Sequence, residues 1–98
     1  MSNFQAYPEP ANLDAMEEEE LWKWSTFCRQ VRPLGAARAL FPERPKGYVT
    51  ATKDLGNYAV NRAVAIRARL DGQIETALLY EGICDRIYQR LPEWARFW

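Results

Sequence analysis

The chain contains no histidine among its 98 residues and only two cysteines, and it has no long apolar run. The lack of histidine removes the side chain that most often acts as a general base and most often binds transition metals. Cys28 and Cys84 stand far apart and match no metal-binding spacing, so we expect no metal site and no cofactor. No apolar stretch is long enough to span a membrane, and the N-terminus lacks a signal-peptide pattern. We therefore expect a cytoplasmic protein without membrane association.

Patterns typical of enzymes are missing as well. There is no glycine-rich phosphate loop, and Ser25, Cys28 and Cys84 have no histidine that could activate them. Both cysteines fall on apolar helix faces, where buried and inert thiols are expected. The sequence therefore predicts a protein that is not an enzyme.

Charge is segregated along the chain although the net charge is zero. Residues 1–28 carry six acidic and one basic side chain, residues 29–69 carry nine basic and two acidic ones, and residues 70–98 carry five acidic and three basic ones. The acidic run Glu17–Glu20 suits the first turn of a helix, where negative charge is favoured by the helix dipole. The basic middle segment is the more informative feature, because such segments often contact a partner.

Hydrophobic periodicity predicts an all-α fold, namely a compact bundle of about four helices that ends in an aromatic C-terminal turn. No segment shows the alternation of a strand. Residues 1–12 contain two prolines and no periodic pattern, so we expect an extended N-terminal arm followed by a single helical domain over residues 13–98. Asn12 is the expected N-cap of the first helix, and Thr50 or Thr52 that of the third. The helices are expected over residues 13–31, 34–41, 52–70 and 73–91.

The third helix is apolar on two sides, which is typical of a helix that lies between two neighbours. We therefore expect the helical pair 52–70 and 73–91 to pack against the first helix and to form the centre of the bundle. Asp71 and Gly72 break the helical pattern and mark the turn of this pair. One apolar strip contains Leu55, Ala59, Ala63, Ile66 and Leu70, and the other contains Val60, Val64 and Ala68.

The stretch from Ala65 to Leu91 resembles a single helical hairpin of the tetratricopeptide type. Gly72 stands at the turn, Ala77 and Leu78 follow it by five and six residues, and Tyr80 and Cys84 match an aromatic and a small position. No second copy occurs in residues 1–50, so the resemblance implies one antiparallel helix pair and a role in protein binding. The chain as a whole is short, lacks histidine and has an aromatic tail, and in this it resembles small accessory proteins of bacterial viruses and mobile elements.

Two sets of residues are candidates for contact with a partner. The first is aromatic and suits a protein interface or a homodimer, although a C-terminus that folds back would bury part of it. The second is the basic set, which would contact phosphates or a partner, with its tyrosine as a stacking residue. The alternative is that the same charges balance the acidic first helix within the fold. The aromatic set is Trp22, Trp94, Phe97 and Trp98, and the basic set is Arg38, Arg44, Lys46, Lys53, Tyr58, Arg62 and Arg69.

Two functions follow from these sets. The favoured one is a non-enzymatic protein-interaction module, such as a viral or mobile-element protein that inhibits or adapts a larger bacterial complex, for example a host defence complex. The alternative is a nucleic-acid-associated accessory protein that uses the basic segment 29–69. The sequence pI near 6.3 counts against the alternative, because nucleic-acid-binding domains are usually strongly basic.

Overall fold

The computed structural model describes residues 8–30 and 44–98, and within these ranges every regular element is helical. The predicted all-α class is confirmed, but the described residues contain three α-helices rather than about four. The short helix expected at residues 34–41 lies outside the described residues. The elements are, in chain order, the 3-10 helix η1 (Leu13–Ala15), α1 (Glu18–Arg29), α2 (Tyr48–Leu70), α3 (Ile74–Arg90) and the 3-10 helix η3 (Glu93–Ala95).

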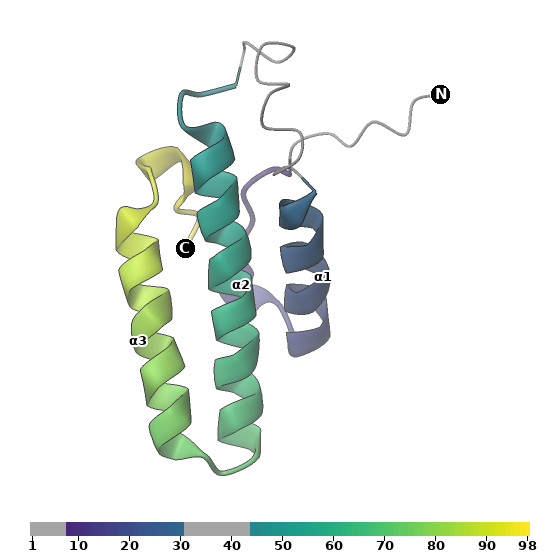
Figure 1. The fold of residues 1–98 in the computed structure, drawn as a ribbon, viewed down its shortest axis with the longest axis vertical. Helices are drawn as coiled ribbons and strands as arrows, with labels where there is room; N and C mark the ends of the chain where they lie inside the picture. Colours follow the sequence, from purple (N-terminus) through teal and green to yellow (C-terminus); the bar gives the residue numbers. More distant parts are fainter. Residues whose placement is uncertain (1–7, 31–43) are drawn as a thin grey trace.

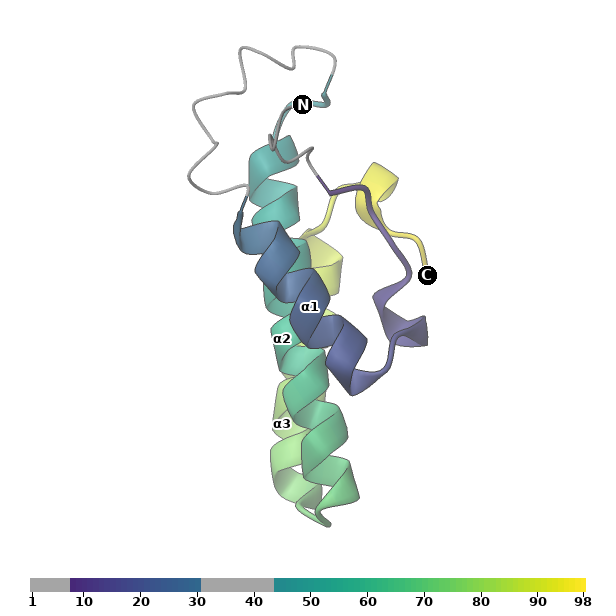
Figure 2. The ribbon, with the colours of Figure 1, turned by 90° about the vertical axis from the view of Figure 1, so that its right-hand side faces the viewer.

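The three α-helices form one layer with α2 in the middle, as Figure 1 shows. α2 contacts both α1 and α3, so the expectation that this helix lies between two neighbours is confirmed. Seen from the side in Figure 2, the segment that carries η1 and the C-terminal segment with η3 both run along one face of this layer. That face is therefore covered by the two ends of the described chain.

The first helix is shorter than the sequence predicted, because the chain turns out of the helix between η1 and α1. Asn12 does act as a cap, but of η1: its side-chain oxygen accepts a hydrogen bond from the backbone N–H of Asp14 at 3.1 Å. Met16 and Glu17 are extended, and α1 then begins anew at Glu18. The carboxylate of Glu20 accepts the backbone N–H of Glu17 at 3.0 Å, so the acidic run itself provides the new start.

α2 begins at Tyr48, four residues before the predicted start, and its N-cap is Gly47 rather than Thr50 or Thr52. The sequence signal of the two threonines was misleading, because Thr52 is buried inside the helix and Thr50 lies in its first turn. Tyr48 is also buried, and its ring stacks on Trp94 with the ring centres 5.3 Å apart. The packing of Tyr48 on the ring of Trp94 thus accompanies a start of α2 that lies before the two threonines that local capping preference favours.

The α2–α3 hairpin has its turn where the sequence predicted it. Gly72 adopts a left-handed conformation with φ of 76°, which glycine enters without steric cost. The N–H of Gly72 donates to the carbonyl of Arg69 at 3.1 Å, and that of Gln73 donates to the carbonyl of Ala68 at 2.8 Å. This is the Schellman pattern, which ends α2 and reverses the chain within two residues. α3 therefore starts at Ile74, one residue from its predicted position.

α1 approaches α2 closely at a glycine. A methyl group built on Gly56 would lie 2.9 Å from the Cβ atom of Cys28, closer than side-chain carbons come in proteins. Small residues continue along this side of α2, where Ala59 and Ala63 are fully buried. The absence of bulky side chains on α2 is therefore what allows α1 to lie against it.

We predict that Gly56→Ala lowers the free energy of unfolding by about 1–2 kcal/mol, although alanine favours helix formation over glycine. The added methyl group forces α1 away, and overpacking of this kind costs about 1–3 kcal/mol, against a helix gain of about 0.5–1 kcal/mol. Gly82→Ala in α3 is the matched control, because the nearest atom to its new methyl group is a guanidinium nitrogen of Arg86 at 3.9 Å.

The control should therefore stabilise the protein by up to about 1 kcal/mol. Urea unfolding followed by circular dichroism measures both changes. Equal stabilisation by the two substitutions would mean that α1 does not approach α2 at Gly56.

Candidate protein-interaction surface

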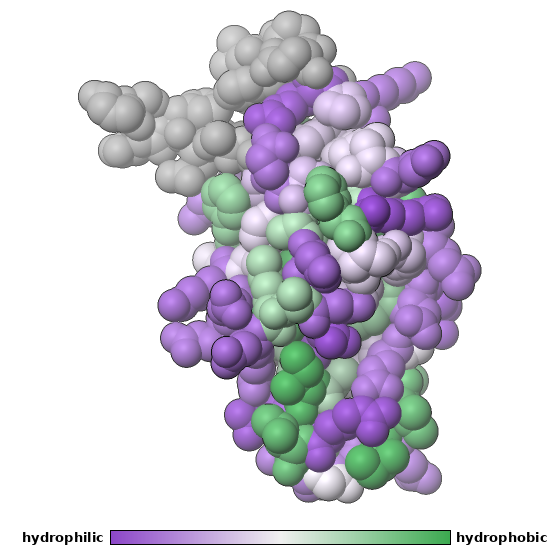
Figure 3. All heavy atoms as spheres, turned by 180° about the vertical axis from the view of Figure 1, so that it is seen from behind, coloured by the Kyte–Doolittle hydropathy of each residue, from purple (hydrophilic) through white to green (hydrophobic). Residues whose placement is uncertain are grey.

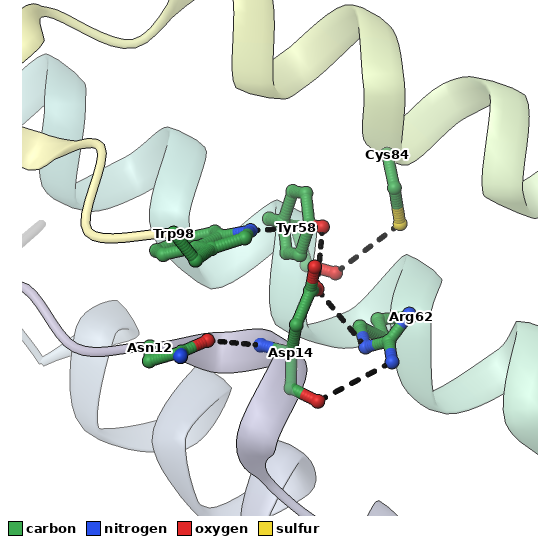
Figure 4. A network of polar contacts seen from close by, with 6 residues as sticks. All are labelled: Asn12, Asp14, Tyr58, Arg62, Cys84 and Trp98. Carbon is green, nitrogen blue, oxygen red and sulfur yellow. Dashed lines mark hydrogen bonds and ion pairs between the residues drawn. The ribbon is translucent and has the colours of Figure 1, made fainter.

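A polar network joins η1, α2 and the C-terminus on the covered face of the helical layer (Figure 4). One carboxylate oxygen of Asp14 accepts the hydroxyl of Tyr58 at 2.7 Å and lies 3.1 Å from Nε of Arg62. The indole N–H of Trp98 donates to the same hydroxyl at 3.3 Å, and Tyr88 donates its hydroxyl to the carbonyl of Trp98. These contacts hold both ends of the described chain on α2, which is a structural role.

Tyr58 is therefore not available as a stacking residue, and the structure corrects this part of the sequence interpretation. Its side chain is only 5% exposed, with Trp98 packed edge-on against the ring at a centre distance of 5.3 Å. Burial, followed by the hydrogen bond to Asp14, raises the pKa of Tyr58 above its ordinary value. Tyr58 looked available because the sequence does not show that η1 and the C-terminal segment cover it.

The other members of the basic set are mostly engaged within the fold. Arg69 forms a two-pronged pair with Glu81, one contact being 2.8 Å, and holds the pKa of Glu81 below its ordinary value. Arg44 pairs with Glu9 at 2.6 Å and lies over the ring of Tyr48. Lys46 and Lys53 are exposed, and Arg38 lies outside the described residues. Three of the five described cations of this set are thus bound to carboxylates, but only Arg62 pairs with a residue of the predicted first helix, Asp14, whereas Arg44 pairs with Glu9 and Arg69 with Glu81 of α3.

The aromatic set divides into a packed half and an exposed half. Trp94 stacks on Tyr48, and Trp98 packs between Tyr58 and Tyr88, so both tryptophans are largely part of the body. Trp22 and Phe97 remain 40% and 57% exposed. They are not brought together, because Trp22 lies on the outer side of α1 while Phe97 belongs to the C-terminal segment.

A groove between α1 and α2 has Trp22 as part of its wall. Its apolar lining is completed by Ile66 and Leu70 of α2, and its volume is about 670 Å³. A second shallow hollow, lined by Phe27 among others, lies on the other side of Trp22. The indole of Trp22 therefore stands as a ridge between two hollows, where a partner could contact both of its sides.

Exposed apolar side chains continue from this groove around the α2–α3 turn. Leu70 was assigned to the core from its helical spacing, but it is 69% exposed, because α1 begins too late in the sequence to cover the last turn of α2. Ile74 follows directly after the turn, and Leu78 and Leu79 come one turn further along α3. Figure 3 shows hydrophobic atoms on the lower part of the molecule, at the end that carries this turn.

Of the exposed apolar side chains of this surface, only Trp22 was among the candidates from the sequence, although a signal for two others was present. Leu78 and Leu79 do not belong to the apolar stripe that recurs at spacings of three and four along the predicted helix 73–91. Of its members, Ala77, Cys84, Ile87 and Leu91 are buried and Tyr80 is half-buried. Two adjacent leucines outside a clear core stripe should lie on the surface, where they need an explanation. Leu70 gave no such signal, because it fits the apolar strip of α2 and its exposure depends on where α1 begins.

The groove has an acidic border. Glu17, Glu18 and Glu19 line it, together with Lys23 and Arg67. Both cations already have carboxylate partners: Lys23 lies 3.5 Å from Glu19, and Arg67 lies 2.9 Å from Glu18. The local excess of negative charge is therefore not cancelled within the described residues.

The two cysteines lie in the interior, as expected. Burial raises the pKa of both Cys28 and Cys84 to about 12. No group of three metal-ligating side chains comes together in the described part of the chain. Of the described helices, none combines the length and apolar character needed to cross a bilayer.

Comparison with protein-family models, with curated proteins and with solved structures gave no significant match. Residues 8–30 and 44–98 define a layer of three α-helices, one face of which is covered by the segments that carry η1 and η3. The geometry and chemistry of the surface therefore carry the information on function.

We predict that Asp14→Ala lowers the free energy of unfolding by about 1–3 kcal/mol, because the buried hydroxyl of Tyr58 loses its acceptor. Glu19→Ala removes only an exposed ion pair with Lys23 and should change stability by less than about 1 kcal/mol. Chemical denaturation of the two variants measures the difference. Equal losses would show that the Asp14 network does not hold the ends of the chain on α2.

The raised thiol pKa values give a further prediction. At neutral pH, Cys28 and Cys84 in the folded protein should react with an aromatic disulfide reagent more than about a hundredfold slower than an exposed thiol. In denaturant both thiols should react at once, which is the control. Because the folded thiols keep their protons to higher pH than the unfolded ones, stability should also fall as the pH rises above the ordinary thiol value of 9.0. Rapid modification of one thiol in the folded state would contradict this assignment.

Proposed function

We propose that the chain is a non-enzymatic protein-interaction module that binds its partner at the end of the molecule formed by the α1–α2 groove and the α2–α3 turn. The observation that supports this most is the distribution of exposed large apolar side chains. Of the six in the described residues, only Phe97 lies elsewhere; the other five line the groove or flank the turn. They are Trp22, Leu70, Ile74, Leu78 and Leu79.

Such a concentration is unusual for a surface that faces only water. Single exposed apolar residues are common, but five at one end of a small domain mark an interaction site. Covering one leucine of this kind contributes about 1.5–3 kcal/mol, so a partner that covers two or three gains a substantial part of an ordinary binding free energy. Trp22 adds a residue type that is enriched among the energetically dominant residues of interfaces.

The buried thiols and the engaged arginines also favour binding over chemistry. Neither cysteine presents a thiolate at neutral pH. The nucleic-acid alternative has less support, because Tyr58 is buried and because Arg44, Arg62 and Arg69 are each held by a carboxylate. A role as an inhibitor or adaptor of a larger bacterial complex stays a proposal that rests on the resemblance to viral and mobile-element accessory proteins.

The test is co-purification from the source organism with tagged variants. Leu70→Gln combined with Leu78→Gln should reduce recovery of the main co-purifying protein at least about tenfold, because two exposed apolar contacts are lost. Phe97→Gln is the matched control, since it removes a similarly exposed apolar side chain from another part of the surface. Quantitative mass spectrometry measures recovery of the same protein in each sample.

The outcome is decisive only if all variants fold, which thermal melts can establish. The two leucines are more than half exposed, so their replacement should leave the melting temperature nearly unchanged. Loss of the partner with Phe97→Gln but not with the double variant would place the interface at the C-terminus. Unchanged recovery with both would refute the proposed surface.

A further inference from the structure

We infer that the partner of the α1–α2 groove is a basic amphipathic segment of another protein, in which apolar side chains are flanked by lysines or arginines. The inference rests on the proposed function and adds the chemistry of the partner. It depends on one juxtaposition: an apolar floor of Ile66 and Leu70 with the indole of Trp22, directly beside the acidic first turn of α1.

The groove is lined by more carboxylates than cations. Glu17, Glu18 and Glu19 line it, against Lys23 and Arg67. Both cations are already held, Lys23 by Glu19 and Arg67 by Glu18 and Asp71. Glu17, which caps α1, and Glu20 in its first turn form no ion pair with a described cation.

This charge distribution discriminates between the occupants that an apolar groove could accept. In a symmetric dimer the same patch would face itself, so two acidic borders would be brought together. Nucleic acids and anionic membrane surfaces carry the same sign of charge as the groove border and would be repelled. A basic protein segment is attracted by the border and can place its apolar side chains on the floor.

The groove also lies between two helices, which is the geometry in which amphipathic helices often bind. The hollow on the far side of Trp22 extends the contact area across the ridge that this side chain forms. Leu70 closes the groove at the end of α2, beyond the part that α1 covers. An apolar side chain of the partner would therefore lie between Trp22 and Leu70, with its basic neighbours over the first turn of α1.

The experiment uses the full chain and three fluorescein-labelled peptides of about four helical turns. The first has leucines at every third or fourth position with lysines between them, the second has glutamates in place of the lysines, and the third has serines in place of the leucines. Fluorescence anisotropy gives the affinity of each peptide at low and at moderate salt. Sedimentation of the chain alone reports self-association.

We expect only the leucine–lysine peptide to bind well, and its affinity to fall as salt is raised. Leu70→Gln should weaken this binding at least about tenfold, and Glu17→Gln with Glu19→Gln should weaken it and reduce its salt dependence, because both carboxylates line the groove. Phe97→Gln should leave the affinity unchanged within about twofold, because this residue lies outside the groove.

Three results would overturn the inference. Equal binding of the glutamate peptide, or a dimer that Leu70→Gln disrupts, would keep the groove as an interaction site but with a different occupant. Equal binding of the serine peptide would show attraction by charge alone, without use of the apolar floor. Binding that Leu70→Gln does not change, or no binding, would remove the basic segment as occupant of this groove, while the co-purification experiment decides the proposed function separately.

Discussion

The fold depends on the coverage of α2 from both sides. This helix carries apolar residues on more than one face, and a single partner helix would leave one of these faces in water. α3 covers one side. The tight turn at Gly72 makes this pairing local in sequence, so closing the loop between the two helices costs little conformational entropy. α1 covers the other side, where Gly56, Ala59 and Ala63 allow it to come close. The network around Asp14 then fastens the two end segments over the third side.

The same constraint explains why one end of the molecule is left apolar. α1 has 12 residues and α2 has 23, so α1 cannot cover the whole length of its neighbour. The interruption at Met16 and Glu17 shortens α1 at its N-terminal end, which is the end next to Arg67 and Leu70. If the first helix had run continuously from residue 13, as its periodicity suggested, the last turns of α2 would have had a further turn of helix beside them. The break thus leaves the groove open and places Glu17, Glu18 and Glu19 at its border.

The sequence predicted the parts of the fold that depend on local signals. Glycine, helical period and spacing indicate the hairpin turn, the limits of α3 and the interior position of both cysteines, and each of these features is found in the structure.

The sequence did not predict features that arise from contacts between residues distant in the sequence. Tyr48 extends α2 because it stacks on Trp94, and Tyr58 is buried because Asp14 and Trp98 reach it from the two ends of the described chain. For the same reason the candidate surface could be found only in part: Trp22 belongs to the aromatic set that the sequence offered for an interface, whereas the exposure of Leu70 depends on the length of another helix.

The arrangement of charges separates structural from functional residues more clearly than residue type does. The arginines that looked like a binding surface are paired one by one with carboxylates from other elements: Arg44 with Glu9, Arg62 with Asp14 and Arg69 with Glu81. Each of these pairs joins segments far apart in sequence or neighbouring helices, so their charges serve the fold.

The carboxylates that open α1 exceed the cations near them, and they border side chains that the fold leaves uncovered. An unbalanced charge next to an uncovered apolar groove stabilises the monomer little, since only the dipole of α1 and a few exposed ion pairs benefit from it. Its favourable energy would become available when a segment of opposite charge covers the groove, and this is why we propose the acidic border, rather than the basic segment, as the part of this molecule that recognises a partner.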